Sequence, residues 1–494
     1  MKNNTVIKRI VILISAVLFF AFCFDISIGS IKTPSFVILV AITAALIILF
    51  RKSIPDLSVF CIMLSGIALK LAYVIYTPVW CRQHDVIDFG AGEGHAAYME
   101  YILSHKALPD FDPRSVWAFF QPPLHHMISA VWMWLNIILG LDENHMHKNV
   151  QILPLCYMCV LMFITYLICR QLSMSTKGRI VTLLITSFHP IYIMMSASLN
   201  NDALSVMLSV LAIYVALLWY LYPTTGKIIL LALTIGLAMC AKLSSALVAP
   251  PIAAMMIYKT VTDTNGFKDK PKVISYILEF LAFAVIVFPL GLWWPVRNRI
   301  LFDMPVNYIP EVGEHLESAG MTSVLFDVRT ASPFLYMKAN GFSHDEYNFV
   351  LAAIKSSLFG EGDYAKLPWY VTVAGALLFA LAVIVLILQI IAMLRTFFVK
   401  EASPDKGIRI LLFVAVITFI AAFAAFALSG MNLSAMDPRY CAAVVSFLSV
   451  FCGIWYDRLA AKGKHALRTI VMTTSVSFAA VSAIFYILVG VLQN

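Results

Sequence analysis

Long apolar stretches, separated by short polar connections, run along almost the whole chain. About 20 apolar residues in a helix span the roughly 30 Å hydrocarbon core of a bilayer. Stretches near this length predict thirteen transmembrane helices, at residues 8–28, 34–50, 56–76, 151–170, 178–198, 202–222, 227–242, 244–259, 273–296, 369–395, 408–429, 437–456 and 468–491. The pattern therefore predicts an all-α polytopic membrane protein in which the helix bundle is itself the core.

The composition agrees with a membrane bundle and excludes an ordinary soluble domain. Of the 494 residues, 61% are hydrophobic and 13% are charged, and the mean hydropathy is +0.88. Most Lys and Arg lie in short loops, where they set topology, so the net charge of +8 indicates no nucleic-acid partner. The first apolar run follows Lys2, Lys8 and Arg9 without a small-residue cleavage site, which favours a retained anchor over a signal peptide.

Lys and Arg in the short connections also predict the orientation of the helices. They place the N-terminus in the cytoplasm and two large loops, residues 77–150 and 297–368, outside. With thirteen crossings the C-terminus lies outside as well. A bundle that presents two large polar loops on one side is expected to have its active site there.

This orientation holds only if the apolar run at residues 121–140 does not cross the membrane. The run begins with QPPLHH, contains Trp132 and Trp134, and ends with LDENHMHK. Prolines and histidines at its start, with indoles further along, favour a helix that lies in the outer interface. A true crossing is the alternative, and it would invert every later loop.

Titratable residues are concentrated in the first outer loop, in the segment RQHDVIDFGAGEGHAAY. Asp85 and Asp88 are three residues apart, and Glu93 and His95 lie in or after a glycine-rich bend that lets the chain fold back. A carboxylate held near apolar lipid has a raised pKa and can act as a general base. The alternative is a solvated loop with scattered charges.

Further polar residues lie at the predicted outer edges of the bundle. SLNNDALS contains Asn201 and Asp202, AMCAKLSSAL contains Lys242, WWPVRNRI contains Arg297, and MDPRY contains Arg439. Cations at these positions oppose the usual topology trend, and a lysine within an apolar stretch is costly. They suit an anionic lipid phosphate, which a guanidinium binds bidentately. A turn with a helix cap, a snorkelling lysine and interfacial anchoring are the alternatives.

These segments, in this order, resemble the GT-C superfamily of integral-membrane glycosyltransferases, above all the branch of protein O-mannosyltransferases and the lipid A aminoarabinose transferase. The resemblance covers about residues 56–300 and rests on GHAAYMEYILSHKALP, FFQPPLHHMISAVW, HPIYIMMSASLNNDAL, GLAMCAKLSSAL and WWPVRNRI. It implies a GT-C-like bundle with interfacial helices in its outer loops, a polyprenyl-phosphate-linked sugar donor and an outward-facing active site. It also implies an Asp base in the first outer loop, and we expect His95, Tyr98 and His125 to contact substrate.

The sequence departs from many relatives just before the HxxY segment. Those relatives have an Asp-Glu pair there, whereas this chain has Ala91 and Gly92. The base must then be Asp85 or Asp88, and Asp85 is preferred because it follows a histidine.

The resemblance also suggests how the chain is divided. Residues 1–55 add two helices ahead of the shared catalytic module of residues 56–300. The outer loop of residues 301–368 is expected on the acceptor side, and residues 369–494 are expected to form C-terminal transmembrane helices.

The sequence thus predicts a glycosyltransferase of the cell membrane and envelope, with a transporter or glycolipid flippase, or a non-catalytic anchoring protein, as alternatives. A hexosyl or pentosyl group would pass to a lipid, glycan or protein acceptor, with inversion at the anomeric carbon. The three outer cations would stabilise the leaving lipid phosphate, so no metal or other cofactor is required. A divalent cation bound by Asp88, Glu93 and Asp202 is the alternative.

Overall fold

The computed structural model describes residues 56–79, 87–310, 320–329, 331–335, 346–360, 362, 364, 366–398, 404–431 and 435–492, and among these it contains helices and no strand. The predicted crossings at residues 8–28 and 34–50 lie outside the described residues. The elements are α3 Leu57–Tyr76, α4 Gly94–His105, η1 Pro113–Ser115, α5 Leu124–Ile138, α6 Glu143–Asn149, α7 Ile152–Gln171, α8 Thr176–Phe188, α9 Pro190–Met195, α10 Asp202–Leu221, α11 Thr225–Ala241, η2 Leu243–Val248, α12 Ala249–Asp263, α13 Lys270–Phe302, α14 Met321–Phe326, α15 Phe349–Phe359, α16 Trp369–Phe397, α17 Lys406–Gly430, η3 Pro438–Cys441, α18 Ala443–Ala461 and α19 His465–Leu492.

Nine helical segments of the described residues are long and apolar enough to cross a bilayer. They confirm an all-α polytopic membrane protein, whereas the count of thirteen is not confirmed. Two predicted crossings look different in the structure. The run at residues 178–198 is divided into α8 and α9, and α11 has 17 residues, about 26 Å, which falls short of a full hydrocarbon core.

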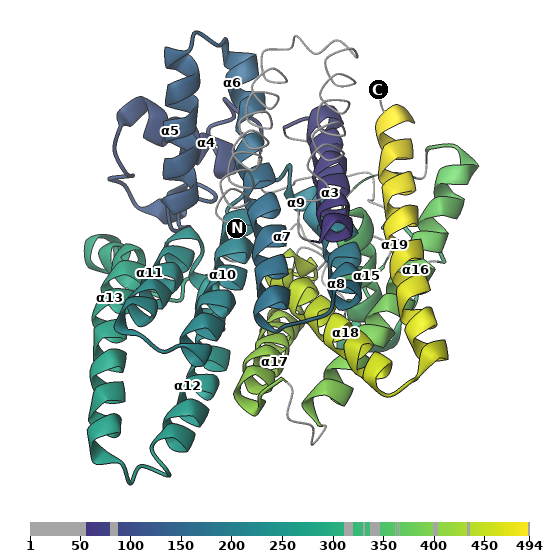
Figure 1. Cartoon of the computed structure of the whole chain (residues 1–494). Coiled ribbons are helices and arrows are strands. Elements are labelled where there is room, and N and C mark those ends of the chain that lie inside the picture. Colours follow the sequence, from purple (N-terminus) through teal and green to yellow (C-terminus); the bar gives the residue numbers. More distant parts are fainter. Residues whose placement is uncertain are drawn as a thin grey trace, which may run out of the picture.

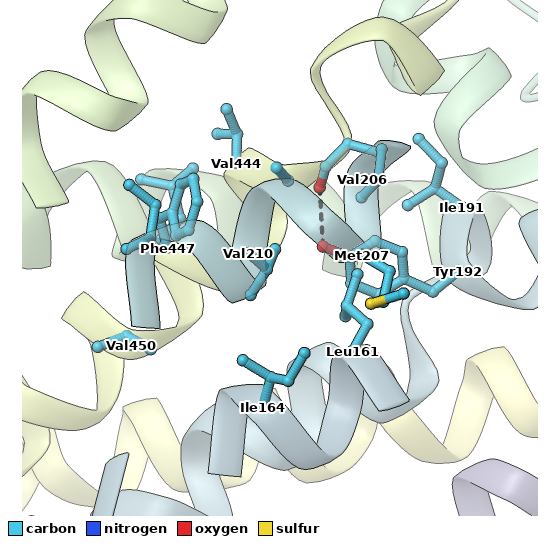
Figure 2. Close-up of a cluster of buried hydrophobic side chains, with 14 of the residues drawn as sticks. Leu161, Ile164, Ile191, Tyr192, Val206, Met207, Val210, Val444, Phe447 and Val450 are labelled. Carbon is cyan, nitrogen blue, oxygen red and sulfur yellow. Dashed lines mark hydrogen bonds between the residues drawn. The ribbon is translucent and has the colours of Figure 1, made fainter. Parts of the chain in front are cut away.

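The apolar core lies where α7, α9, α10 and α18 pack together. Figure 2 shows side chains from these four helices facing one another: Leu161, Ile164, Ile191, Tyr192, Val206, Met207, Val210, Val444, Phe447 and Val450. The hydroxyl of Tyr192 donates to the Ala442 carbonyl at 2.8 Å. This core fixes the first turns of α10 and α18 relative to each other, and both turns follow polar segments.

The break between α8 and α9 is a consequence of proline at position 190. Proline has no N–H to continue the helical hydrogen bonds, so carbonyls in the preceding turn need other donors. The ammonium of the buried Lys70 donates to the Ser187 carbonyl at 2.6 Å, and the hydroxyl of Ser482 donates to the Phe188 carbonyl at 2.7 Å. The carbonyls of Ser187 and Phe188 therefore both have donors. After the break, α9 leads into the turn before α10.

Three short helices, α4, α5 and α6, form an outer module at one end of the molecule, at the upper left in Figure 1 beyond α11 and α13. Helix α5 has 15 residues, about 22 Å, which is too short to cross a hydrocarbon core. One set of its apolar side chains is exposed: Met127, Val131, Trp134, Leu135, Ile137 and Ile138. These features fit the prediction that residues 121–140 lie in the interface.

In the second large loop, α15 packs against α9, α16 and η3. Its Lys355 is buried and pairs with the fully buried Glu346 at 3.1 Å. A buried charge needs such a partner, because an unpaired one is costly to remove from water. The pair joins α15 to the segment just before it, and the contacts of α15 with η3 place both at that end of the bundle.

We expect the loop of residues 77–150 to face outside and α5 not to cross. In a variant with Cys81 replaced by Ser, a cysteine at the exposed Asn144 should react with an impermeant thiol reagent added to intact cells. The Cys81→Ser parent without the new cysteine is the control for background labelling. Labelling of position 144 only after permeabilisation would contradict this topology.

Candidate functional site

A buried carboxylate meets two cations where three separate parts of the chain come together. Lys242 Nζ donates to Asp202 Oδ1 at 2.5 Å, and Arg439 Nε lies 3.6 Å from Asp202 Oδ2. The exposed fractions of these side chains are 13%, 4% and 12% for Lys242, Asp202 and Arg439. Buried charge without a partner is strongly destabilising, so these ion pairs hold α10, the end of α11 and η3 together.

Each of these residues lies where a helix begins or is interrupted. Asp202 is the first residue of α10, where the positive end of the helix dipole stabilises a carboxylate. Lys242 has an extended backbone between α11 and η2. Arg439 lies in η3, which begins after Asp437, whose carboxylate accepts a hydrogen bond from the Arg439 N–H at 3.0 Å. Helix ends leave backbone N–H and C=O groups without helical partners, so this site contains backbone polar groups as well as charged side chains.

Tyr440 and Asp437 complete this cluster. The Tyr440 ring centroid lies 4.7 Å from Lys242 Nζ and 5.1 Å from the guanidinium carbon of Arg439, distances at which cations are attracted to the ring face. Asp437 lies 3.6 Å from Arg439 Nε. Arg439 Nη2 also donates to the Tyr440 hydroxyl at 3.1 Å, and the two carboxylates of the cluster balance its two cations.

Asn201 lies beside the cluster and contacts the first outer loop. Its Nδ2 donates to the Ala241 carbonyl at 2.7 Å and to Gln121 Oε1 at 3.3 Å. Its Oδ1 is buried and has no hydrogen-bond partner among the described residues. A hydroxyl or amide of a ligand would satisfy this acceptor, since buried polar atoms are usually paired.

Buried histidines join the outer module to the turn before α10. His125 Nε2 lies 2.8 Å from the Leu199 carbonyl, and His95 Nδ1 lies 2.8 Å from His126 Nε2. Tyr98 stacks on His126 with ring centroids 4.3 Å apart. Burial lowers the pKa of His125 to about 4 and holds the pKa of His126 well below its usual value. Both rings are therefore neutral at pH 7, and His125 donates its Nε2–H to the turn.

The acidic residues of the first outer loop lie apart from this cluster. Asp88 and Glu93 are exposed, and Asp88 Oδ1 accepts from the Phe89 N–H at 2.8 Å. Among the described residues, no hydrogen bond or ion pair joins either carboxylate to Asp202. Asp85 lies outside the described residues, so its assignment as the base stays a prediction.

The alternative of a divalent cation bound by Asp88, Glu93 and Asp202 stays a prediction. The part of the chain that the structure describes contains no group of three or more His, Cys, Asp or Glu that could hold a metal ion. A hard cation needs several converging oxygen ligands.

Arg297 anchors the first outer loop. Its Nη2 donates to the Pro109 carbonyl at 2.5 Å and its Nη1 to Asn298 Oδ1 at 2.9 Å. The guanidinium lies 4.9 Å from the Trp294 ring centroid, and Trp294 Nε1 donates to the Phe120 carbonyl at 3.0 Å. These contacts favour interfacial anchoring over the predicted phosphate contact for this arginine.

Tyr440 and Gln121 contribute to the cluster and its neighbour Asn201, and neither was predicted from the sequence. Tyr440 directly follows Arg439 in MDPRY, and an aromatic residue next to a cation at a bundle edge is a signal for cation–π packing. Gln121 begins the QPPL segment, but no sequence pattern indicates that its amide reaches Asn201.

Comparison with known proteins supports the resemblance over the part of the chain that contains Asp202 and Lys242. Residues 122–293, about a third of the chain, match the family model of dolichyl-phosphate-mannose-protein mannosyltransferase. No curated protein matches the chain.

Two solved structures are also similar to it. One is the archaeal oligosaccharyltransferase AglB from Archaeoglobus fulgidus, in complex with an inhibitory peptide and a dolichol-phosphate, with 14% identity over 90% of this chain and 56% of that chain and a TM-score of 0.49. The other is ArnT from Cupriavidus metallidurans in the apo state, with 14% identity over 86% of this chain and 76% of that chain and a TM-score of 0.41. The chain thus spans little more than half the length of the oligosaccharyltransferase.

The buried histidines of the outer module should make stability depend on pH. An unfolded histidine has a pKa near 6.5, whereas the folded value for His125 is about 4. Below pH 6.5 the unfolded chain therefore binds more protons, so stability is full above this pH and is lost as the pH falls towards 4. Thermal unfolding of the purified protein between pH 7.5 and 4.5 should show a falling midpoint.

The control for this measurement is His125→Gln, whose amide can still donate to the Leu199 carbonyl but does not titrate. Its midpoint should change less with pH than that of the wild type. An equal slope in the two proteins would show that other groups cause the acid sensitivity.

Proposed function

We propose that this protein transfers a sugar from a polyprenyl-phosphate-linked donor to an acceptor at the outer face of the membrane. The single observation that most supports this function is the buried cluster of Lys242 and Arg439 around Asp202. Two of these three residues lie in the segment that matches the mannosyltransferase family. Cations of this kind, fixed at one end of an apolar bundle, suit the phosphate of a lipid-linked donor.

The cluster would act on the leaving group. As the acceptor attacks the anomeric carbon, the bond from that carbon to the phosphate oxygen breaks, and its electron pair stays on the phosphate. Lys242 has N–H donors beyond the one that binds Asp202, and Arg439 has five in a planar fork. In a site of low polarity such fixed donors stabilise the developing charge more than water does.

Asp202 would position these cations rather than react. Its two oxygens contact a different cation each, so it holds both near one point. Because carboxylates and cations balance in the cluster, an incoming phosphate must share the cations with Asp202 and Asp437. This balance favours release of the lipid phosphate after transfer, since no large excess of positive charge retains it.

The acceptor proton would pass to a carboxylate of the first outer loop, for which Asp85 is our choice. The acceptor hydroxyl or amine loses this proton as it forms the bond to the anomeric carbon, which inverts. The unpaired Oδ1 of Asn201 lies beside the phosphate cluster and would accept a hydrogen bond from donor sugar or acceptor. The sugar is a hexose or pentose, and the acceptor is a lipid, glycan or protein.

The cation cluster can be tested with purified protein and a panel of polyprenyl-phosphate-linked sugars. Lys242→Ala and Arg439→Ala should each weaken donor affinity about tenfold to a hundredfold, the value of one or two hydrogen bonds to a charged group. The matched control is Lys272→Ala, which removes a 61% exposed lysine at a predicted cytoplasmic edge and should leave affinity unchanged.

Normal donor binding and turnover in both cluster variants would overturn this assignment. Release of free polyprenyl phosphate by the wild type separates a transferase from a flippase, because a flippase moves the donor intact.

Loss of the base should lower the rate without abolishing donor binding. Asp85→Asn keeps the size of the side chain, and removal of a general base costs about 10²–10⁴-fold in rate. Single-turnover transfer should fall by this factor, with smaller losses for the control variants Asp88→Asn and Glu93→Gln. Near wild-type transfer by Asp85→Asn, with loss in either control, would move the assignment to that carboxylate.

A further inference from the structure

Lys148, near the end of α6, has a half-buried ammonium with a complete set of acceptors. Its Nζ lies 2.5 Å from the Val74 carbonyl, 2.8 Å from the Thr77 carbonyl and 2.6 Å from Gln151 Oε1. An ammonium has three N–H donors, and each has one of these oxygens. Val74 and Thr77 are at the C-terminal end of α3, where helical carbonyls lack their own N–H partners and a cation is favourable.

Gln151 continues this chain of contacts towards the site. Because Oε1 accepts from Lys148, the amide can have only one orientation, with Nε2 on its other side. There Nε2 donates to the Ala197 carbonyl at 3.1 Å. Gln151 is fully buried, so its two hydrogen bonds face no competition from water.

This chain of contacts joins the end of α3 to the turn before Asp202. Thr77 begins the first outer loop, which contains the predicted base. Ala197 lies in the turn of residues 196–201, which leads directly into Asp202 at the start of α10. Carbonyls in such a turn need donors from elsewhere, and Gln151 supplies one to Ala197 as His125 does to Leu199.

We propose that Lys148 and Gln151 are positioning residues that fix the turn of residues 196–201, and with it Asn201, relative to the end of α3. This inference rests on the proposed function. The relay runs from the end of α3 through Lys148 and Gln151 to the turn before Asp202. Lys242 and Arg439 reach Asp202 from other elements, so loosening the relay should impair the alignment of Asn201 with the reacting groups more than donor binding.

Gln151→Glu tests the relay selectively. Glutamate keeps the contact with Lys148 but has no N–H for the Ala197 carbonyl, and its second oxygen repels that carbonyl. We expect kcat to fall about tenfold to a hundredfold, as for a misplacement near 1 Å, with KM for the lipid-linked donor changed less than about twofold. Hydrogen exchange of a peptide spanning residues 196–202 should also accelerate severalfold.

Asn149→Asp is the matched control. It makes the same amide-to-acid change two residues away, on a buried side chain whose Nδ2 donates to Asn136 of α5 and not to the turn. It should leave both kcat and exchange at the turn close to wild type. Should Gln151→Glu fail to fold, Gln151→Met, which removes both polar contacts, replaces it with the same readouts.

The relay is refuted if exchange at residues 196–202 is unchanged in the Gln151 variant, or if the control accelerates it equally. A kcat that stays at the wild-type value despite faster exchange would refute the positioning role. These outcomes differ from a failure of the proposed function, in which wild-type protein releases no polyprenyl phosphate from any donor while the exchange result still decides whether the relay exists.

Discussion

The ion pairs of Asp202 with Lys242 and Arg439 determine where three distant parts of this chain must meet. None of the three charges can be buried alone at the edge of a membrane bundle without a large desolvation cost. Each therefore depends on the other two, and α10, the end of α11 and η3 must converge for the bundle to form. The same convergence places two cations around a single point, which is the geometry that a phosphate requires.

Helix interruptions are the structural consequence of this constraint. Regular helices pair their own backbone groups and offer little polarity, whereas the ends and breaks expose carbonyls and N–H groups. The breaks after α11 and before α18 border the cluster, and the turn after α9 leads to it. Polar side chains from elsewhere donate to carbonyls at such positions: Lys70 and Ser482 at the break before α9, and Gln151 at the turn after it. Buried lysines that have no carboxylate partner are thus explained as caps of helix ends.

Much of the fold could be predicted from the sequence because hydrophobic length decides what crosses a membrane. The crossings at α3, α7, α10, α12, α13, α16, α17, α18 and α19 follow this rule closely. The prolines and histidines at the start of the 121–140 run favoured a helix that lies in the interface. The break at Pro190 was missed, although HP within an apolar run is a local signal for it. Lys70, more than a hundred residues away in the sequence, donates to a carbonyl at this break and so offsets the loss of a helical hydrogen bond. A hydropathy pattern gives no information on a contact between such distant residues.

The residue types of the candidate site could be predicted from the sequence, but which residues form ion pairs with one another could not. Lys242 and Arg439 could each be picked out from the sequence, because a charged side chain at the edge of an apolar helix costs free energy of desolvation and calls for a reason. That Asp202 binds both depends on the three-dimensional packing of α7, α9, α10 and α18, whose apolar side chains meet in Figure 2, and on the contact of α10 with η3. Arg297 satisfies the same sequence rule, yet it binds a loop carbonyl and stacks on Trp294. Lys242 and Arg439 thus differ from Arg297 in that a buried carboxylate orients them.

The cluster and the outer module contribute to the site in different ways. The bundle supplies charged side chains, whereas His125 of α5 and Gln151, just before α7, contact backbone carbonyls of the turn before Asp202. Such contacts fix the position of the turn without adding charge, so they leave the balance of the cluster unchanged. Under the proposed function, a change of acceptor would then call for new side chains on the outer loops, while the ion pairs proposed to bind the lipid phosphate could stay the same.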